Sequence, residues 1–119
     1  MALLAVYELG QTGFKIEDNL VAAEAAGDSV PIDERTLIVI ANGAAGAVCN
    51  VTIAKTRDTA DKHGFGSLGV DDIVLAIPNL ETWVVRAPIA SHGDAAGRIT
   101  MTYDQVVNVT VGGLRLARH

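Results

Sequence analysis

The feature that most constrains the fold of this chain is a two-residue alternation of apolar and polar side chains. It is clearest from Arg98 to Tyr103, which reads R-I-T-M-T-Y, and it recurs from Val48 to Thr56 and from Val107 to Val111. Alternation with this period places apolar side chains on one face of a strand and polar ones on the other. The pattern therefore predicts strands with one face against a core.

Turn-forming residues divide this region into short segments. Asn42-Gly43 follows the apolar run Leu37 to Ala41, and Pro78-Asn79 separates Ile73 to Ile77 from Glu81 to Arg86. Asn-Gly between strand-like runs is typical of a hairpin, and proline cannot donate to a sheet ladder. These signals predict two hairpins, one formed with the alternating strand after Gly43 and one around Pro78.

The remaining segments are compatible with an all-β fold. Leu3 to Leu9 is either the first strand or part of an N-terminal arm over residues 1–10. Asn19 to Ala26 is either a short helix or an irregular alanine-rich connection, and Gly112-Gly113 indicates a bulge or bend in the last strand. We expect seven or eight short strands in one antiparallel β-sandwich, jelly-roll-like in form.

Length and composition agree with a single domain over residues 1–119. The chain is 50% hydrophobic but only 4% aromatic, so its core must be aliphatic. Such a core lacks the large burial of aromatic rings, which favours further stabilisation by a partner surface. The single cysteine, Cys49, excludes an internal disulfide and is interpreted as a small buried side chain.

The net charge of −5, with no clustered basic residues, argues against nucleic-acid binding. The opening sequence MALLAVYELG has no basic region and reaches an acidic residue early. We therefore expect neither a signal peptide nor a membrane span in it.

A glycine pattern, G-x-G-x-x-G, lies within His63–Gly69. In a dinucleotide-binding fold this motif directly follows a strand and opens a helix. Here a polar stretch, Arg57 to Lys62, precedes it and a β-rich run follows it, so the interpretation is a pliable loop without a cofactor.

Two further groups of reactive residues favour structural interpretations. Ser91, His92 and Asp94 are the residue types of a hydrolase triad, but sequence neighbours rarely converge in one, and a turn is favoured. An acidic loop could hold a cation but does not match an EF-hand, so no metal is assigned; its residues are Asp58, Asp61, His63, Asp71 and Asp72. The chain is predicted not to be an enzyme.

One ordered set of segments carries a resemblance to a known family. It consists of an apolar strand ending in Asn42-Gly43, a segment from Gly66 to Pro78, the stretch Gly97 to Tyr103 (G-R-I-T-M-T-Y), and Val107 to Leu116. In this order the chain resembles small all-β proteins of tailed bacteriophages that are encoded beside the major capsid protein. The resemblance covers roughly residues 10 to 117 and departs from the family at residues 57–63 and 21–26.

The resemblance implies a capsid decoration, or cement, protein on the outer surface of the virion. Such a protein binds the major capsid protein and stabilises the shell by bridging its subunits. A homo-oligomer is expected, with a trimer favoured, and neither nucleic acid nor membrane as partner. No catalytic residue transfers from the family.

The expected contacts are the N-terminal segment and the loops Arg57 to Asp72 and Ala87 to Gly97. The individual residues are Ala2, Leu3, Leu4, Val6, Tyr7, Phe65, Leu68, Trp83 and Ile89. Two other functions stay open: a head–tail connector or tail component, and a carbohydrate-binding or host-recognition module. The absence of a clear helix weighs against the first, and five aromatic residues, from the composition, weigh against the second.

Overall fold

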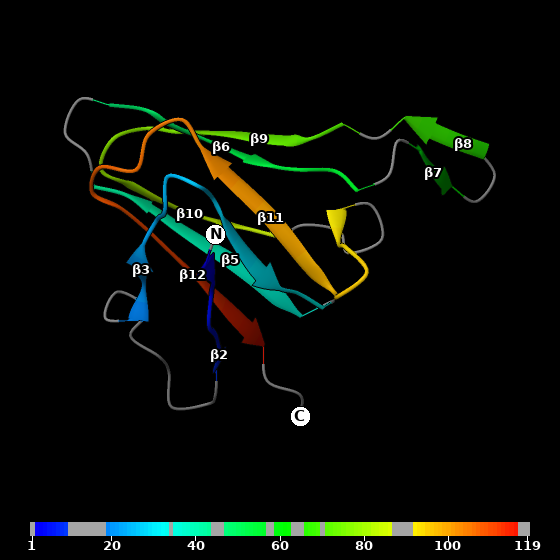
Figure 1. Cartoon of the computed structure of the whole chain (residues 1–119), viewed down its shortest axis with the longest axis horizontal. Helices are drawn as coiled ribbons and strands as arrows, with labels where there is room; N and C mark the ends of the chain where they lie inside the picture. Colours follow the sequence, from blue (N-terminus) through cyan, green and yellow to red (C-terminus); the bar gives the residue numbers. More distant parts are fainter. Residues whose placement is uncertain are drawn as a thin grey trace.

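The protein is an all-β structure in which two sheets face each other (Figure 1). The computed structural model describes residues 2–9, 19–33, 35–43, 47–56, 59–62, 66–69, 71–86 and 92–116. Twelve strands lie within these ranges. The predicted all-β class is therefore confirmed.

The two sheets have five strands each, and a separate ribbon has two. The first sheet has the order β1 (Ala2–Leu3), β4 (Asp28–Pro31), β11 (Arg98–Tyr103), β6 (Cys49–Ile53), β9 (Ile73–Ile77). The second has the order β10 (Glu81–Val85), β5 (Thr36–Asn42), β12 (Val109–Leu116), β2 (Val6–Leu9), with β3 (Val21–Ala22) also paired to β12. The ribbon consists of β7 (Thr59–Lys62) and β8 (Gly66–Gly69).

The core lies between the two sheets and is aliphatic, as the composition predicts. The alternating residues of β6 and β11 face it, and the first sheet contributes Cys49, Val51, Ile53, Ile99 and Met101, all fully buried. The second sheet contributes Ile38, Ile40, Val109 and Val111. The period-two pattern thus identified the inner faces of β6 and β11 correctly, and that of β12 from Val109, but Val107, which it grouped with Val109 and Val111, is 68% exposed.

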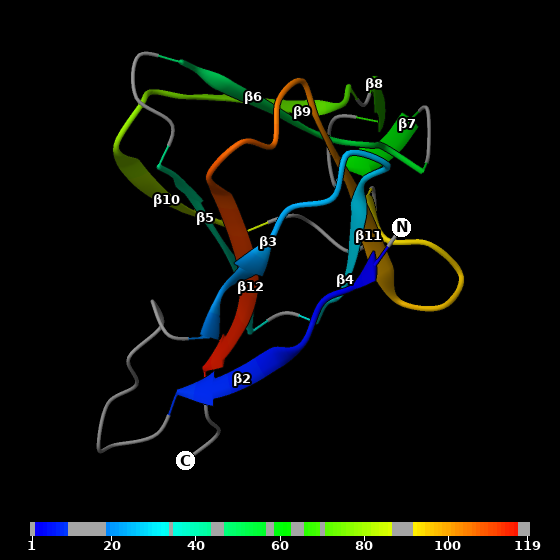
Figure 2. The same ribbon diagram turned by 60° about the vertical axis from the view of Figure 1, so that its left-hand side comes forward.

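Both predicted hairpins are wrong. β5 pairs with β10 and β12 in the second sheet, whereas β6 pairs with β11 and β9 in the first. The chain also changes sheets between β9 and β10 (Figure 2). Turn residues specify that the chain reverses, but they do not specify the sheet that receives the next strand. β5 already has a neighbour on each side, so β6 cannot pair with it.

The N-terminal segment also divides between the sheets. β1 runs parallel to β4 and β2 runs parallel to β12, so the predicted single strand is two strands. The Leu4 amide donates to the Ser29 carbonyl at 2.8 Å, and the Gly113 amide donates to the Ala5 carbonyl at 3.3 Å. Residues 4 and 5 therefore carry the chain from one layer to the other, along the side of the sandwich opposite β9 and β10.

Gly112-Gly113 is not a bulge, because β12 keeps a continuous register with β5 from Val109 to Arg115. The two glycines instead allow close approach of other segments. A Cβ atom on Gly113 would lie 2.7 Å from Val6 Cγ2, and one on Gly112 would lie 2.8 Å from Leu20 Cδ2.

The segment from Asn19 to Ala26 is not a helix. It contains the short strand β3, and the Gly27 amide then donates to the Glu24 carbonyl at 2.9 Å to close a turn. Gly27 has a φ of 99°, which favours glycine at that position. The sequence predicted seven or eight strands, and the described residues form twelve. The number is higher because the predicted first strand is two strands, and because four strands were not predicted: β3, β4, β7 and β8.

The predicted loop over residues 57–72 contains the β7–β8 ribbon, which projects from the sandwich (Figure 1). The backbone at its root is held by three contacts. The Lys55 amide donates to Asp72 Oδ1 at 2.8 Å, Thr56 Oγ1 donates to the Gly93 carbonyl at 2.7 Å, and His92 Nε2 lies 3.1 Å from the Asp71 carbonyl. The ribbon is therefore an extension of the β6–β9 pair.

The close approach of β2 to β12 gives a stability prediction. Gly113→Ala should lower the free energy of unfolding by about 1–3 kcal/mol, because the new methyl group overlaps Val6. Val6→Ala opens the space that the methyl group needs. In a double-mutant cycle measured by urea denaturation, the two changes together should cost less than their sum by at least about 0.5 kcal/mol. Strict additivity would contradict this packing.

Candidate docking surface

A buried asparagine organises one end of the sandwich. Asn42, the last residue of β5, is 1% exposed. Its Nδ2 group donates to the Ala47 carbonyl at 2.9 Å and to the Ile77 carbonyl at 3.0 Å. These carbonyls belong to two of the places where the chain changes sheets, between β5 and β6 and between β9 and β10, so one amide group holds both crossings.

The same residue reaches the connection between β11 and β12. Gln105 Nε2 donates to Asn42 Oδ1 at 3.3 Å, and Gln105 Oε1 accepts from the Val107 amide at 3.0 Å. The backbone adds two bonds, from the Leu80 amide to the Asn42 carbonyl at 2.7 Å and from the Gly43 amide to the Asn108 carbonyl at 2.9 Å. Three connections that are distant in sequence are thereby tied together (at the left of Figure 1).

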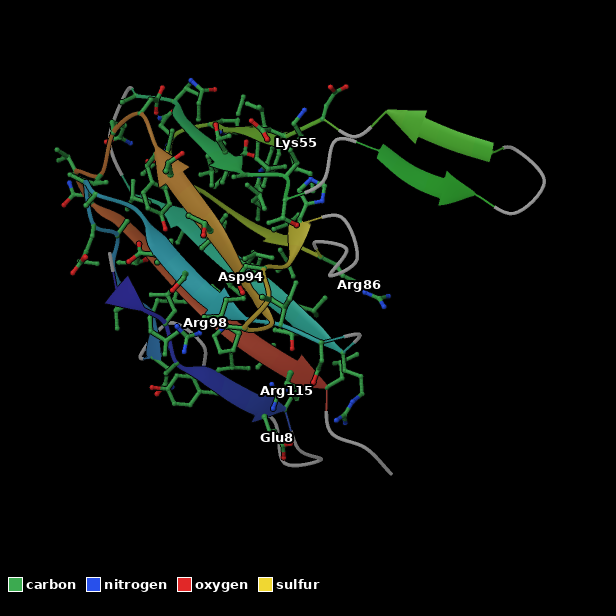
Figure 3. The ribbon with its side chains drawn as sticks, turned by 45° about the vertical axis from the view of Figure 1, so that its right-hand side comes forward. Glu8, Lys55, Arg86, Asp94, Arg98 and Arg115 are labelled. Atoms are coloured by element: carbon green, nitrogen blue, oxygen red, sulfur yellow. The ribbon has the colours of Figure 1, made fainter. Side chains whose placement is uncertain are left out.

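Each of these connections exposes an aliphatic side chain. Leu80 is 73% exposed, Val107 is 68% exposed and Val48 is 50% exposed. We call these three residues and the turns that carry them the loop end. The turns read NGAAGAV, PNL and QVVN, and carboxylates flank two of them. Asp104, which opens the β11–β12 connection, is exposed and accepts from the Asn50 amide at 2.8 Å, and the exposed Glu81 follows Leu80. None of the charged side chains labelled in Figure 3 lies there.

Leu80 is held in an unfavourable backbone conformation. Its φ is 64°, and the Glu81 amide donates to the Pro78 carbonyl at 3.3 Å, which places Leu80 third in a four-residue turn. This position normally favours glycine or asparagine, and a leucine there costs about 1 kcal/mol or more. The fold thus holds a large apolar side chain in solvent at a position where a smaller residue would be more stable.

The opposite end of the sandwich is charged. Arg115 Nε lies 3.0 Å from Asp33 Oδ2, and Arg35 Nη1 donates to the Leu116 carbonyl at 2.9 Å. The Arg35 backbone amide, above all, lowers the pKa of the Asp33 carboxyl, with further contributions from the Thr36 hydroxyl and the two arginines. The two ends therefore differ: one carries an ion pair, and the loop end exposes three aliphatic side chains.

The structure does not gather the sequence-predicted contact residues on one surface. On the N-terminal side, Leu3 is 55% exposed, Leu4 is buried in the core at 3%, and Val6 and Tyr7 are half-buried. Trp83 lies on β10, at the other edge of the second sheet from β2, and is packed against the core. Its Nε1 donates to Glu81 Oε1 at 3.0 Å.

The other predicted contacts are placed only in part. Ala2 lies in β1 and Leu68 in β8, where the backbone alone is described, and Phe65 and Ile89 lie outside the described residues. The loop-end residues were missed, although the sequence holds a signal for them: aliphatic side chains directly beside turn residues.

One carboxylate lies inside the sandwich. Asp28 is fully buried, and its Oδ2 accepts from the Tyr103 hydroxyl at 2.7 Å and from the Glu24 amide at 3.2 Å. Within the described part of the chain its Oδ1 has no hydrogen-bond partner. Burial, and then the bond to Asp28, raises the pKa of Tyr103. The pair joins β4 to β11 within the first sheet.

Cys49 is buried, as the sequence indicated. Its Sγ donates to the Gln105 carbonyl at 3.4 Å, and burial raises the pKa of the thiol. A raised pKa reduces the thiolate fraction that nucleophilic chemistry requires.

The two motifs are described in part, since Ser91 and Gly64 lie outside the described residues. Asp94 Oδ1 accepts from the amides of Ala96 and Arg98 at 2.8 and 3.0 Å, which is the turn that the sequence predicted. In the glycine motif, Gly66 and Gly69 belong to β8, and β9 is the next element. The described residues hold no group of three or more potential metal ligands; the side chains of Asp58, Asp61 and His63 lie outside them.

No known protein family, curated protein or solved structure matches this chain. In the residues that the structure describes, no helix is long and apolar enough to cross a membrane.

The role of Asn42 can be tested with an isosteric change. Asn42→Asp removes both Nδ2 donors, leaving the Ala47 and Ile77 carbonyls without them and placing a charge in the interior. We expect a loss of about 2–4 kcal/mol in the free energy of unfolding at neutral pH, measured by urea denaturation. The matched control is Asn79→Asp, at an exposed turn position, which should change stability by less than about 0.5 kcal/mol. Equal effects would contradict the network.

The Tyr103–Asp28 pair predicts an alkaline loss of stability. The folded-state pKa of Tyr103 is raised above the unfolded value of about 10. The stabilising contribution of the Tyr103 hydroxyl to the free energy of unfolding is therefore complete below about pH 10 and declines as the pH rises further. Tyr103→Phe should cost about 1–3 kcal/mol at neutral pH and should flatten the alkaline decline. Denaturation measured between neutral and strongly alkaline pH tests this, and identical slopes for both proteins would refute it.

Proposed function

We propose that this chain is a structural virion protein that binds the outer face of a bacteriophage capsid and stabilises the shell by bridging major capsid protein subunits. The sequence resemblance supplies the functional class. The observation that carries the proposal in the molecule is the loop end, where Leu80, Val107 and Val48 are exposed.

The physical basis of binding is the burial of aliphatic surface. Burying apolar area contributes about 25 cal/mol per Å², and the carboxylates of Asp104 and Glu81 beside the loop end can keep their water at the rim of the contact. Three aliphatic side chains give a modest contact at each site. On a lattice of identical subunits, an oligomer would engage several sites together, so weak contacts would combine.

The strain at Leu80 supports the same proposal. Backbone strain that persists at an exposed position suggests selection for the side chain held there. A leucine in this turn lowers the stability of the free protein, and the cost can be recovered when the side chain is buried against a partner. The net charge of −5 suits an outer surface, away from the packaged genome.

The test separates binding from stability at one residue. Leu80→Asn should raise the free energy of unfolding by about 0.5–1 kcal/mol, because asparagine tolerates a positive φ better than leucine does. The same change should weaken binding to purified capsids that lack the protein, measured by co-sedimentation, and should reduce the heat resistance that the protein confers on them.

The matched control is Leu116→Asn, at a 44% exposed position near the charged end. It should leave capsid binding unchanged. Failure of the wild-type protein to bind any capsid form would overturn the proposed function. Wild-type binding that Leu80→Asn leaves intact would overturn the role of the loop end.

A further inference from the structure

The edge strands of this protein differ in how they are protected against pairing with another chain. β10 begins with Glu81 and β2 contains Glu8, so both carry a charge along the edge. β1 has only two residues. Short length and edge charges are the usual devices that prevent edge-to-edge association.

β9 has none of these devices. It forms one margin of the first sheet, pairs only with β6 among the described strands, and reads I-V-L-A-I over five residues (Figure 1). Val74 is 62% exposed and Ala76 is also exposed. An uncharged, apolar edge strand of this length is a template for a further strand.

The inner face of β9 is also incompletely covered. Ile73 and Leu75 pack against the core but remain half-buried, whereas Ile77 of the same strand is fully buried. Trp83 and Val85 of β10, the edge strand of the facing sheet, are half-buried as well. A strand added to β9 would therefore cover apolar side chains in addition to main-chain groups.

The sequence around β9 fits a second copy of itself. In an antiparallel pair centred on Leu75, Val74 faces Ala76 of the other copy, so a larger side chain meets a smaller one. The acidic residues Asp71 and Asp72 then face Asn79 and Pro78, which are uncharged, and no like charges meet. The strand is therefore complementary to a second copy of itself, as an interface around a two-fold axis requires.

The ribbon does not prevent this pairing. The ribbon precedes Ile73 in the sequence and lies beyond one end of β9 (Figure 1). Two antiparallel copies of β9 would therefore send their ribbons out at opposite ends of the pair.

We propose that β9 pairs with β9 of a second copy around a two-fold axis, joining two five-stranded sheets into one continuous sheet. This self-association surface is centred on β9 and adjoins the loop end at Pro78 and Asn79.

The test uses the full-length protein in solution without capsids. Analytical ultracentrifugation over a range of concentrations should show a reversible dimer. Val74→Lys puts a lysine on the edge of each copy and should raise the dimer dissociation constant at least about tenfold. Ala76→Lys, at a second exposed position on the same edge, should also raise the dimer dissociation constant. It provides an independent measurement if one of the two variants folds poorly.

The matched control is Val84→Lys on β10, where the native side chain is similarly exposed at 59%. It should change the dissociation constant by less than about twofold. A wild-type protein that stays monomeric at all concentrations, a trimer that Val74→Lys does not affect, or a dimer that Val84→Lys weakens equally would each overturn the proposal. Contact between the loop end and the capsid is tested separately, by the Leu80 variant.

Discussion

The rest of the structure depends on the hydrogen bonds of one buried side-chain amide. Asn42 ends an interior strand of the second sheet and donates to carbonyls at two of the three nearby places where the chain passes between layers. A buried amide whose donors and acceptor are all engaged fixes geometry strongly, because any rearrangement leaves polar groups unpaired in a dry interior. The apolar core holds the layers together, but it does not by itself determine which strand follows which. Asn42 supplies that specification at the loop end.

The properties of the loop end follow from this constraint. Because the Leu80 amide donates to the Asn42 carbonyl, the turn after β9 is drawn close to β5, and Leu80 adopts a positive φ. Asn108 also has a positive φ, and its carbonyl accepts from Gly43. A Cβ atom on Gly43 would lie 2.9 Å from that carbonyl oxygen, so glycine is needed there. The resulting surface is rigidly bonded underneath and aliphatic outside, which is a suitable arrangement for docking on another protein.

The sequence predicted the strands better than their partners. Ile99 and Met101 were placed on the inner face correctly because alternation reports local burial directly. Asn42-Gly43 was interpreted as the turn of a hairpin because the signal is local, whereas sheet membership depends on residues far along the chain. Gly112-Gly113 suggested a bulge for the same reason: the side chain of Val6 that requires glycine lies more than a hundred residues away in sequence. The loop end was missed because three connections had to be brought together before its exposed residues formed one surface.

The central claim, that Asn42 ties three connections into one unit, is tested most directly by native-state amide hydrogen exchange. The informative amides are those of Leu80, Gly43 and Val107, each of which is bonded within the network. If the network holds the loop end, these amides should exchange with similar opening free energies, close to that of the core strands, and Asn42→Asp should lower all three together. Fast exchange at these amides in the wild-type protein, or a change at only one of them in the variant, would contradict the account.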